Sequence, residues 1–90
     1  MAPALRRSAA FARRVLVLPP GARRPCRDGE WKGTLVAINS GRIELERAGQ
    51  PARRFQQGDL LWLGGLGLSA IHNPGPAPAI LTAVSRLPSR

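Results

Sequence analysis

The sequence contains few of the residue types that carry chemistry. Its 90 residues include one cysteine, one histidine, two tryptophans, two phenylalanines and no tyrosine. A single cysteine forms no disulfide within the chain and supplies no thiolate pair for a zinc site. A reducing, cytoplasmic location is therefore expected. No apolar run reaches the roughly 18 residues that a membrane-spanning helix needs, so a membrane is not expected as a partner.

Acidic residues are also scarce. The chain has 14 basic and 5 acidic residues, and its formal net charge is +9. The segment 1–27 holds seven arginines and no acid, whereas the segment 28–90 holds seven basic and five acidic residues. An arginine-rich arm is one way to bind nucleic acid, but the aromatic platform on which single-strand binders stack bases is missing. Binding of nucleic acid is the least favoured of the alternatives.

Short apolar runs separated by turn residues predict an all-β protein. In the segment 42–46, Ile43 and Leu45 share one face and three charged side chains share the other, as in a half-buried antiparallel strand. Strands are expected at 14–18, 34–38, 42–46, 52–55, 60–63, 68–72 and 79–85, with hairpins over 34–46 and 68–85. The pattern predicts one β-sandwich or barrel domain at 14–86, between a basic flexible arm at 1–13 and a C-terminal tail at 87–90.

The last third of the chain carries the most distinctive pattern. A Gly58-Asp59 turn precedes an apolar strand, a glycine-rich bend follows at 64–67, and a further strand ends at Asn73. This order and its spacing resemble the second sequence motif of the cupins. A first cupin motif can be anchored on Gly41. The resemblance implies a small antiparallel barrel of cupin type, also called a double-stranded β-helix or jelly roll, over most of the chain.

Cupins usually hold a metal with three histidines and one glutamate. The resemblance places Asp28 and Glu30 at two histidine positions, Thr34 at the glutamate position and Ser69 at the third histidine position. An alternative spacing, with Arg27 and Gly29 at the first two positions, is less suitable still. Two carboxylates and two hydroxyls bind transition metals weakly. No metal and no cofactor are expected.

The same resemblance predicts a ligand site at the barrel mouth. Side chains alternate between the two faces of a strand, so we expect the lining residues to be those that point into the cavity and His72 to point to the opposite face. The candidates are Asp28, Glu30, Thr34, Ser69 and Asn73. A few polar groups over an apolar floor are the default small-molecule site. A metal-independent small-molecule-binding or structural domain is therefore the preferred hypothesis. The carboxylates favour a cationic or polyhydroxylated ligand, and the arginines near them favour the opposite.

The alternative is a small cupin enzyme of the isomerase or hydrolase type, which is less favoured. It would use the carboxylates of Asp28 and Glu30 or the thiol of Cys26, whose pKa the neighbouring arginines would lower. A homodimer is also expected, because the run 60–63 is apolar on both faces. Within that run Trp62 is expected in the core, whereas Trp31 is expected at the rim of the barrel.

Overall fold

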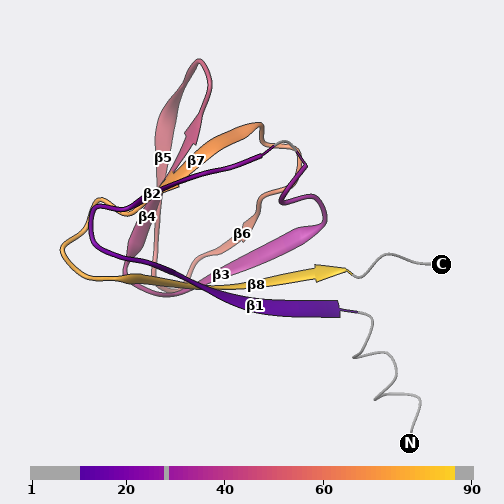
Figure 1. The fold of residues 1–90 in the computed structure, drawn as a ribbon, viewed down its shortest axis with the longest axis horizontal. Helices are drawn as coiled ribbons and strands as arrows, with labels where there is room; N and C mark the ends of the chain where they lie inside the picture. Colours follow the sequence, from indigo (N-terminus) through magenta and orange to yellow (C-terminus); the bar gives the residue numbers. More distant parts are fainter. Residues whose placement is uncertain (1–10, 28, 87–90) are drawn as a thin grey trace, which may run out of the picture.

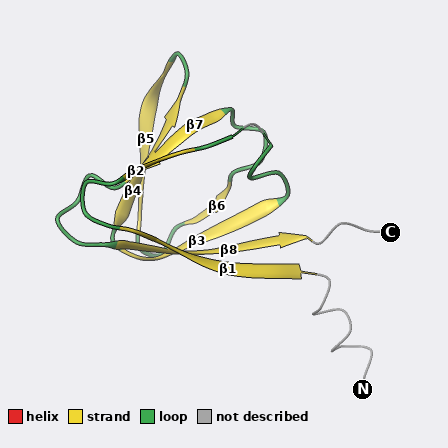
Figure 2. Cartoon of the chain, in the orientation of Figure 1, coloured by secondary structure: helices red, strands yellow, loops and turns green. Residues whose placement is uncertain are grey.

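The computed structural model describes residues 11–27 and 29–86, and in this part of the chain it contains strands and no helix. Figure 2 shows the strands joined by turns and loops. The strands are β1 (Phe11–Leu18), β2 (Arg23–Pro25), β3 (Thr34–Ser40), β4 (Arg42–Arg47), β5 (Gln50–Gln56), β6 (Leu60–Trp62), β7 (Leu68–His72) and β8 (Ala79–Arg86). The all-β fold class predicted from the sequence is confirmed. The described residues accordingly include no helix that is able to cross a membrane.

The strands form two four-stranded antiparallel sheets that face one another (Figure 1). Sheet A has the order β1-β8-β3-β6, and sheet B has the order β2-β7-β4-β5. Successive strands therefore alternate between the sheets, except for β4 and β5, which pair as a hairpin in sheet B. β1 begins at Phe11, three residues earlier than expected, and the segment around 23–25, expected as a loop, adds β2 to the edge of sheet B.

Both hairpins that we predicted, over 34–46 and over 68–85, are wrong. β3 pairs with β6 and β8 in sheet A, whereas β4 pairs with β5 and β7 in sheet B. The chain changes sheet at Gly41, whose φ is 80°. A Cβ atom at this position would lie 2.7 Å from the carbonyl oxygen of Pro78. Glycine thus allows both the left-handed backbone and the close approach of the 74–78 segment.

The core lies between the sheets and follows the alternation of the strands. Its buried residues are Leu18, Trp31, Val36, Ile38, Ile43, Leu45, Leu61, Leu63, Ile71, Ala79, Leu81 and Ala83. The predicted positions of the two tryptophans are reversed. Trp31 is only 3% exposed and closes the core ahead of β3, whereas Trp62 is 60% exposed. Leu61 faces inward, so its strand neighbour Trp62 must face outward.

The two ends of the sandwich differ. At the left of Figure 1 the sheets are joined by the β1–β2, β3–β4 and β7–β8 connections. At the other end the β2–β3 and β6–β7 connections approach one another, and a Cβ on Gly64 would lie 3.3 Å from the backbone nitrogen of Gly33. We call this second end the mouth.

Candidate functional site

The structure does not bring the predicted site residues into one pocket. Thr34 lies opposite Ser85 at the start of β3, with a hydroxyl-to-hydroxyl distance of 3.3 Å. Asn73 lies at the far end, where its amide donates to the carbonyl of Leu18, the residue opposite Ala79. Because β8 rises about 3.3 Å per residue, Ala79 and Ser85 are roughly 20 Å apart. Thr34 and Asn73 therefore do not contact the same small ligand.

Ser69 departs from the expected alternation because it is the extra residue of a β-bulge. Glu46 pairs with Ala70 and Arg47 pairs with Leu68, so Ser69 has no partner on β4. Leu68 takes the inward position and packs against the core, while Ser69 is exposed. The Ser69 hydroxyl donates to the carbonyl oxygen of Glu46 at 3.0 Å. The inward orientation inferred for this side chain from the sequence is wrong.

Glu30 lies near the mouth, where cationic and backbone donors surround its carboxylate. Arg24 donates to it at 2.6 Å, and the backbone N–H of Arg27 donates at 3.1 Å. The hydrogen bond from Arg24 holds the pKa of the Glu30 carboxyl below its ordinary value, against the opposing effect of partial burial. Asp28, the other predicted carboxylate, lies outside the described residues.

The described side chains at these positions do not fit a transition metal. Glu30 is held by Arg24, the Thr34 hydroxyl is buried beside Ser85, and Ser69 is turned outward by its bulge. Within residues 11–27 and 29–86, no three His, Cys, Asp or Glu side chains gather into a group that could hold a metal ion. The described side chains at the positions of the cupin metal ligands therefore do not form a site like the one found in metal-binding cupins.

A different cluster of side chains contacts Trp31 at the mouth. The guanidinium carbons of Arg14 and Arg24 lie 4.9 and 5.3 Å from the centroid of its ring, within the range of cation–π attraction. Its indole N–H donates to the sulfur of Cys26 at 3.3 Å. Burial raises the pKa of the Cys26 thiol and outweighs the lowering effects of Trp31 and Arg24. The lowered thiol pKa expected from the neighbouring arginines is therefore wrong.

Arginines occupy several inward-facing positions near this cluster. Arg24 lies opposite the core residue Ile71. Arg53, opposite Leu45, is exposed, and its guanidinium lies over the ring of Phe55 instead. Arg47 shares the inward side with Leu45 and lies opposite Leu68, and Arg14 shares the side of Leu18 on β1. Two of these side chains contain buried nitrogen atoms, the Nη1 of Arg24 and the Nε of Arg47, that have no hydrogen-bond partner within residues 11–27 and 29–86. Such donors are costly to bury unless a ligand or water satisfies them.

Two hollows open at the mouth beside these residues. One has a volume of about 340 Å³ and lies between the two mouth connections, over the apolar side chains of Trp31, Leu63 and Leu68. The other, of about 500 Å³, is lined by Arg24, Pro25, Arg27, Gly29 and Glu30. The hollows share Arg27, and Lys32 adds a further cation to the first. The first hollow therefore has cations over an apolar base, and the second has two arginines and one glutamate in its described lining.

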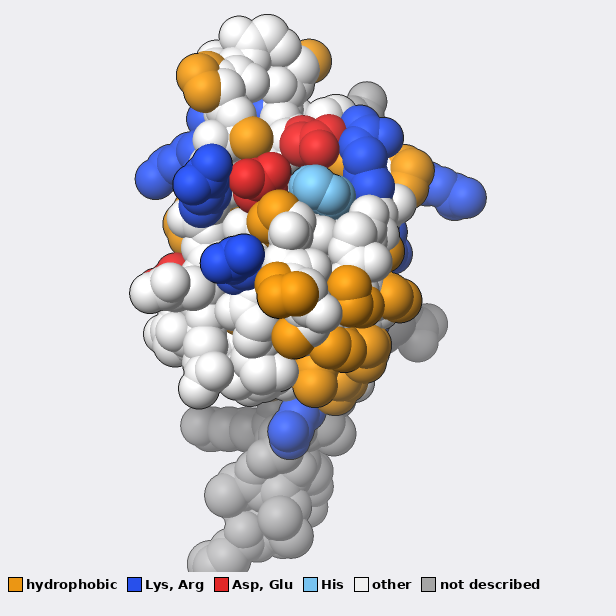
Figure 3. All heavy atoms as spheres, turned by 90° about the vertical axis from the view of Figure 1, so that its left-hand side faces the viewer, with side chains coloured by type: hydrophobic (Ala, Val, Ile, Leu, Met, Phe, Trp, Pro, Cys, Tyr) orange, Lys and Arg blue, Asp and Glu red, His pale blue; other side chains and the backbone are white. Residues whose placement is uncertain are grey.

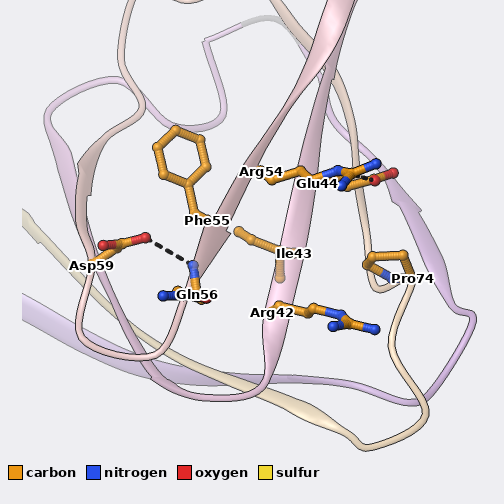
Figure 4. A pocket seen from close by; sticks show the side chains of 8 residues that line it. All are labelled: Arg42, Ile43, Glu44, Arg54, Phe55, Gln56, Asp59 and Pro74. Atoms are coloured by element: carbon orange, nitrogen blue, oxygen red, sulfur yellow. Dashed lines mark hydrogen bonds and ion pairs between the residues drawn. The ribbon is translucent and has the colours of Figure 1, made fainter.

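A larger hollow of about 530 Å³ lies elsewhere, beside β4, β5, the turn before β6 and Pro74 (Figure 4). Its two acids are already engaged. Glu44 contacts Arg54 at 3.3 Å and His72 at 3.4 Å, and Asp59 accepts from the backbone N–H of Gln56 at 2.8 Å. The charges of this hollow are largely neutralised by one another, so we favour the mouth as the candidate site.

His72 faces away from the core, as predicted. It pairs with Glu44 on the outer face of sheet B. The arginines around Trp31 were not predicted from the sequence, because a charged side chain in a half-buried strand is expected to face outward. One signal was present, since Arg14 shares its strand parity with the apolar residues Leu16 and Leu18. For Trp31, which precedes β3, no strand alternation indicated its burial.

Comparison with known proteins identifies the fold. No family model and no curated protein matches the sequence, but solved structures match its fold. The cupin domain of Cnp3 from Schizosaccharomyces pombe is 21% identical with a TM-score of 0.72, over 88% of this chain and 54% of that one. The Cupin_2 domain of an XRE family transcriptional regulator from Enterobacter cloacae is 21% identical with a TM-score of 0.71, over 92% of this chain and 87% of that one. An uncharacterized double-stranded β-helix protein from Klebsiella pneumoniae is 19% identical with a TM-score of 0.72, over 86% and 67%.

Two facing antiparallel sheets with strands that alternate between them define a double-stranded β-helix. This chain spans about half the length of the Cnp3 domain and most of the Cupin_2 domain. The identities are low, so these likenesses establish the fold. The chain has the fold of a small cupin domain, as its sequence motif predicted.

Proposed function

We propose that this chain is a metal-independent cupin-fold domain that binds a small anionic molecule at the mouth around Trp31. The observation that carries the proposal is that Nη1 of Arg24 and Nε of Arg47 are buried and find no hydrogen-bond partner among the described residues. A carboxylate or phosphate oxygen is the natural acceptor for such donors. In the reducing cytoplasm that we propose for this protein, many metabolites carry these groups.

The charge balance at the mouth supports an anion over a cation. The described lining includes Arg24, Arg27 and Lys32 as cations and Glu30 as an acid. Glu30 is already paired with Arg24, so it offers little attraction to a cationic ligand. The guanidiniums of Arg14 and Arg24 both lie beside one indole ring, and an anion between them would offset their mutual repulsion.

The enzymatic alternative has less support from the described residues. A nucleophilic cysteine needs a lowered pKa, whereas burial raises that of Cys26. A general acid or base at Glu30 needs a free carboxyl, and this one accepts hydrogen bonds from Arg24 and from the backbone of Arg27.

Thermal unfolding with a panel of small anions tests the proposal. Citrate would be compared with neutral glycerol and benzoate with neutral benzamide, and inorganic phosphate would be tested beside them. A ligand at ten times its dissociation constant should raise the melting temperature by roughly 5–10 °C in a domain of this size. No shift with any anion, or an equal shift with the neutral counterparts, contradicts the proposal.

A matched pair of variants locates the site. Arg47→Met keeps an unbranched side chain but removes the guanidinium and its charge, and it should abolish the anion-dependent shift. Arg54→Met makes the same change on the outer face of sheet B, where Arg54 pairs with Glu44 and its side chain is 85% exposed. This control should keep the full shift. Equal losses in both variants would indicate general charge attraction instead of a site.

A further inference from the structure

The outer face of sheet A is apolar across its width. Its exposed side chains include Val15 and Val17 on β1, Leu35 on β3, and Leu60 and Trp62 on β6, which are 37–67% exposed. The strand register places them side by side. Leu35 lies opposite Trp62 on one side and opposite Val84 on the other. We call this surface the A face, and it continues from the β1 edge to the β6 edge without a charged side chain in its middle.

The outer face of sheet B has the opposite character. Arg23 pairs with Glu46 at 2.8 Å, and Glu44 contacts both Arg54 and His72. Figure 3 shows acidic, basic and histidine side chains together on the upper part of the molecule, and a gathering of hydrophobic side chains on its lower part. The exposed apolar surface is thus concentrated on one sheet and does not reflect the composition of the whole chain.

The extent of the A face is comparable with that of a protein interface. With Phe11 included, its large exposed side chains offer on the order of 600 Å² of apolar surface, given that one aromatic side chain contributes about 150–250 Å² when fully exposed. The largest apolar patch of a typical monomer is about 300–600 Å². One side of a standard interface buries about 800 Å².

We propose that the A face packs against the A face of a second copy of this chain in a two-fold dimer. This inference goes beyond the proposed ligand site and does not depend on it. Sheets that pack face to face lie about 10 Å apart, with their apolar side chains interdigitating. A two-fold contact needs a surface that is complementary to itself. The A face meets this need because it is apolar and lacks charge in its middle.

Charge placement also fixes the direction of packing. The described cations on this side are Arg13, beside Val84, and Arg86, opposite Phe11, and both lie towards one end of the strands. A two-fold axis running across the strands places this end over the opposite end of the other copy. The arginines of the two copies are then kept apart, although each chain has a formal net charge of +9.

Sedimentation equilibrium of the full chain from 1 to 200 µM, with Trp62→Glu and Leu66→Glu variants, tests the dimer. Trp62→Glu places a charge on the A face at its one exposed tryptophan, opposite Leu35, and should weaken the dimer by about 30-fold or more, as expected for an interface aromatic. Leu66→Glu introduces the same charge at a 37% exposed leucine in the β6–β7 turn, outside the A face. It should leave the dimer intact. Circular dichroism of each variant establishes that it is folded.

Tryptophan emission provides a second measurement. Trp31 is buried and Trp62 is exposed in the single chain, so the emission of Trp62 should shift to the blue as the protein concentration rises and the dimer forms. A wild-type protein that is monomeric at 200 µM overturns the proposal. So does a dimer that is unaffected by Trp62→Glu, which would assign association to strand edges. A monomer that instead co-sediments with anionic phospholipid vesicles overturns it as well, and assigns the A face to a lipid surface.

Discussion

Replacing Asn73 should destabilise the fold strongly, although the sequence indicated this residue as a ligand group. Asn73 is completely buried. Its amide nitrogen donates to the carbonyls of Leu18 at 2.9 Å and Ala77 at 2.8 Å, and its amide oxygen accepts from the N–H of Gly75 at 2.9 Å. One side chain therefore joins the end of β1 to the 74–77 segment.

Asn73→Ala leaves the Gly75 N–H and two carbonyls without these partners. Each unsatisfied buried group costs about 1–3 kcal/mol, and relaxation or water recovers part of it. We expect the free energy of unfolding to fall by about 3 kcal/mol, from a total of roughly 5–13 kcal/mol for 90 residues. Asn73→Asp should be no better, because it keeps the acceptor but replaces the donor to two carbonyls with an oxygen.

Equilibrium unfolding in urea, followed by circular dichroism, measures this change. Asn39→Ala is the matched control, because Asn39 is exposed and accepts one hydrogen bond, from Thr82. This control should change the stability by about 0.5 kcal/mol or less. If Asn73→Ala costs less than about 1 kcal/mol at an unchanged m-value, the buried hydrogen bonds do not hold this end of the sandwich together, and the reasoning is refuted.

Three further predictions follow from individual contacts. Gly41→Ala should lower the free energy of unfolding in urea by about 2–4 kcal/mol, because the new Cβ lies 2.7 Å from the Pro78 carbonyl oxygen. Gly49→Ala is the control: its φ is also positive but the space around it is open, so it should cost only about 1 kcal/mol. Equal costs for the two variants would contradict the steric argument. Cys26 should react with iodoacetamide at pH 8 more slowly than free cysteine, because burial raises its pKa, and a rate above that of free cysteine would show the reverse. Since the pKa of Glu30 is lowered from 4.5 by folding, its contribution to stability is present above that pH and is lost as the pH falls through the folded value. Glu30→Gln should therefore remove part of the acid-side decline in melting temperature, and an unchanged decline would contradict the pairing.

Much of the fold was predictable, because a half-buried strand shows a local alternation of apolar and polar residues in the sequence. The alternation of Ile43 and Leu45 defines β4, and the Gly58–Asn73 motif identified the cupin architecture. No comparable local pattern indicates which strands pair with one another. A run of apolar residues after a turn is compatible with pairing to its neighbour or to a distant strand, and here β3 pairs with β8, forty or more residues away.

The candidate site was less predictable for a related reason. The bulge at Ser69 depends on how β7 is aligned with β4, and one extra residue is enough to exchange the inward and outward positions. The reversal of the tryptophans shows the same limit. Trp31 is buried by the meeting of two distant connections, and Trp62 is exposed because its strand neighbour Leu61 fills the core. The residues adjacent to Trp31 do not indicate its burial, and a run that is apolar on both faces does not indicate whether Leu61 or Trp62 faces inward.

The position of β8 has a consequence for how this protein is made. β8 is the last strand of the described chain, yet it lies between β1 and β3 inside sheet A. While a ribosome is still synthesising residues 79–86, β1 has no partner and the inner face of sheet A is incomplete. Sheet B is complete in sequence by His72 and can begin with its local β4–β5 hairpin. We therefore expect vectorial synthesis to yield a half-formed sandwich with open strand edges, which closes only when its final strand is inserted.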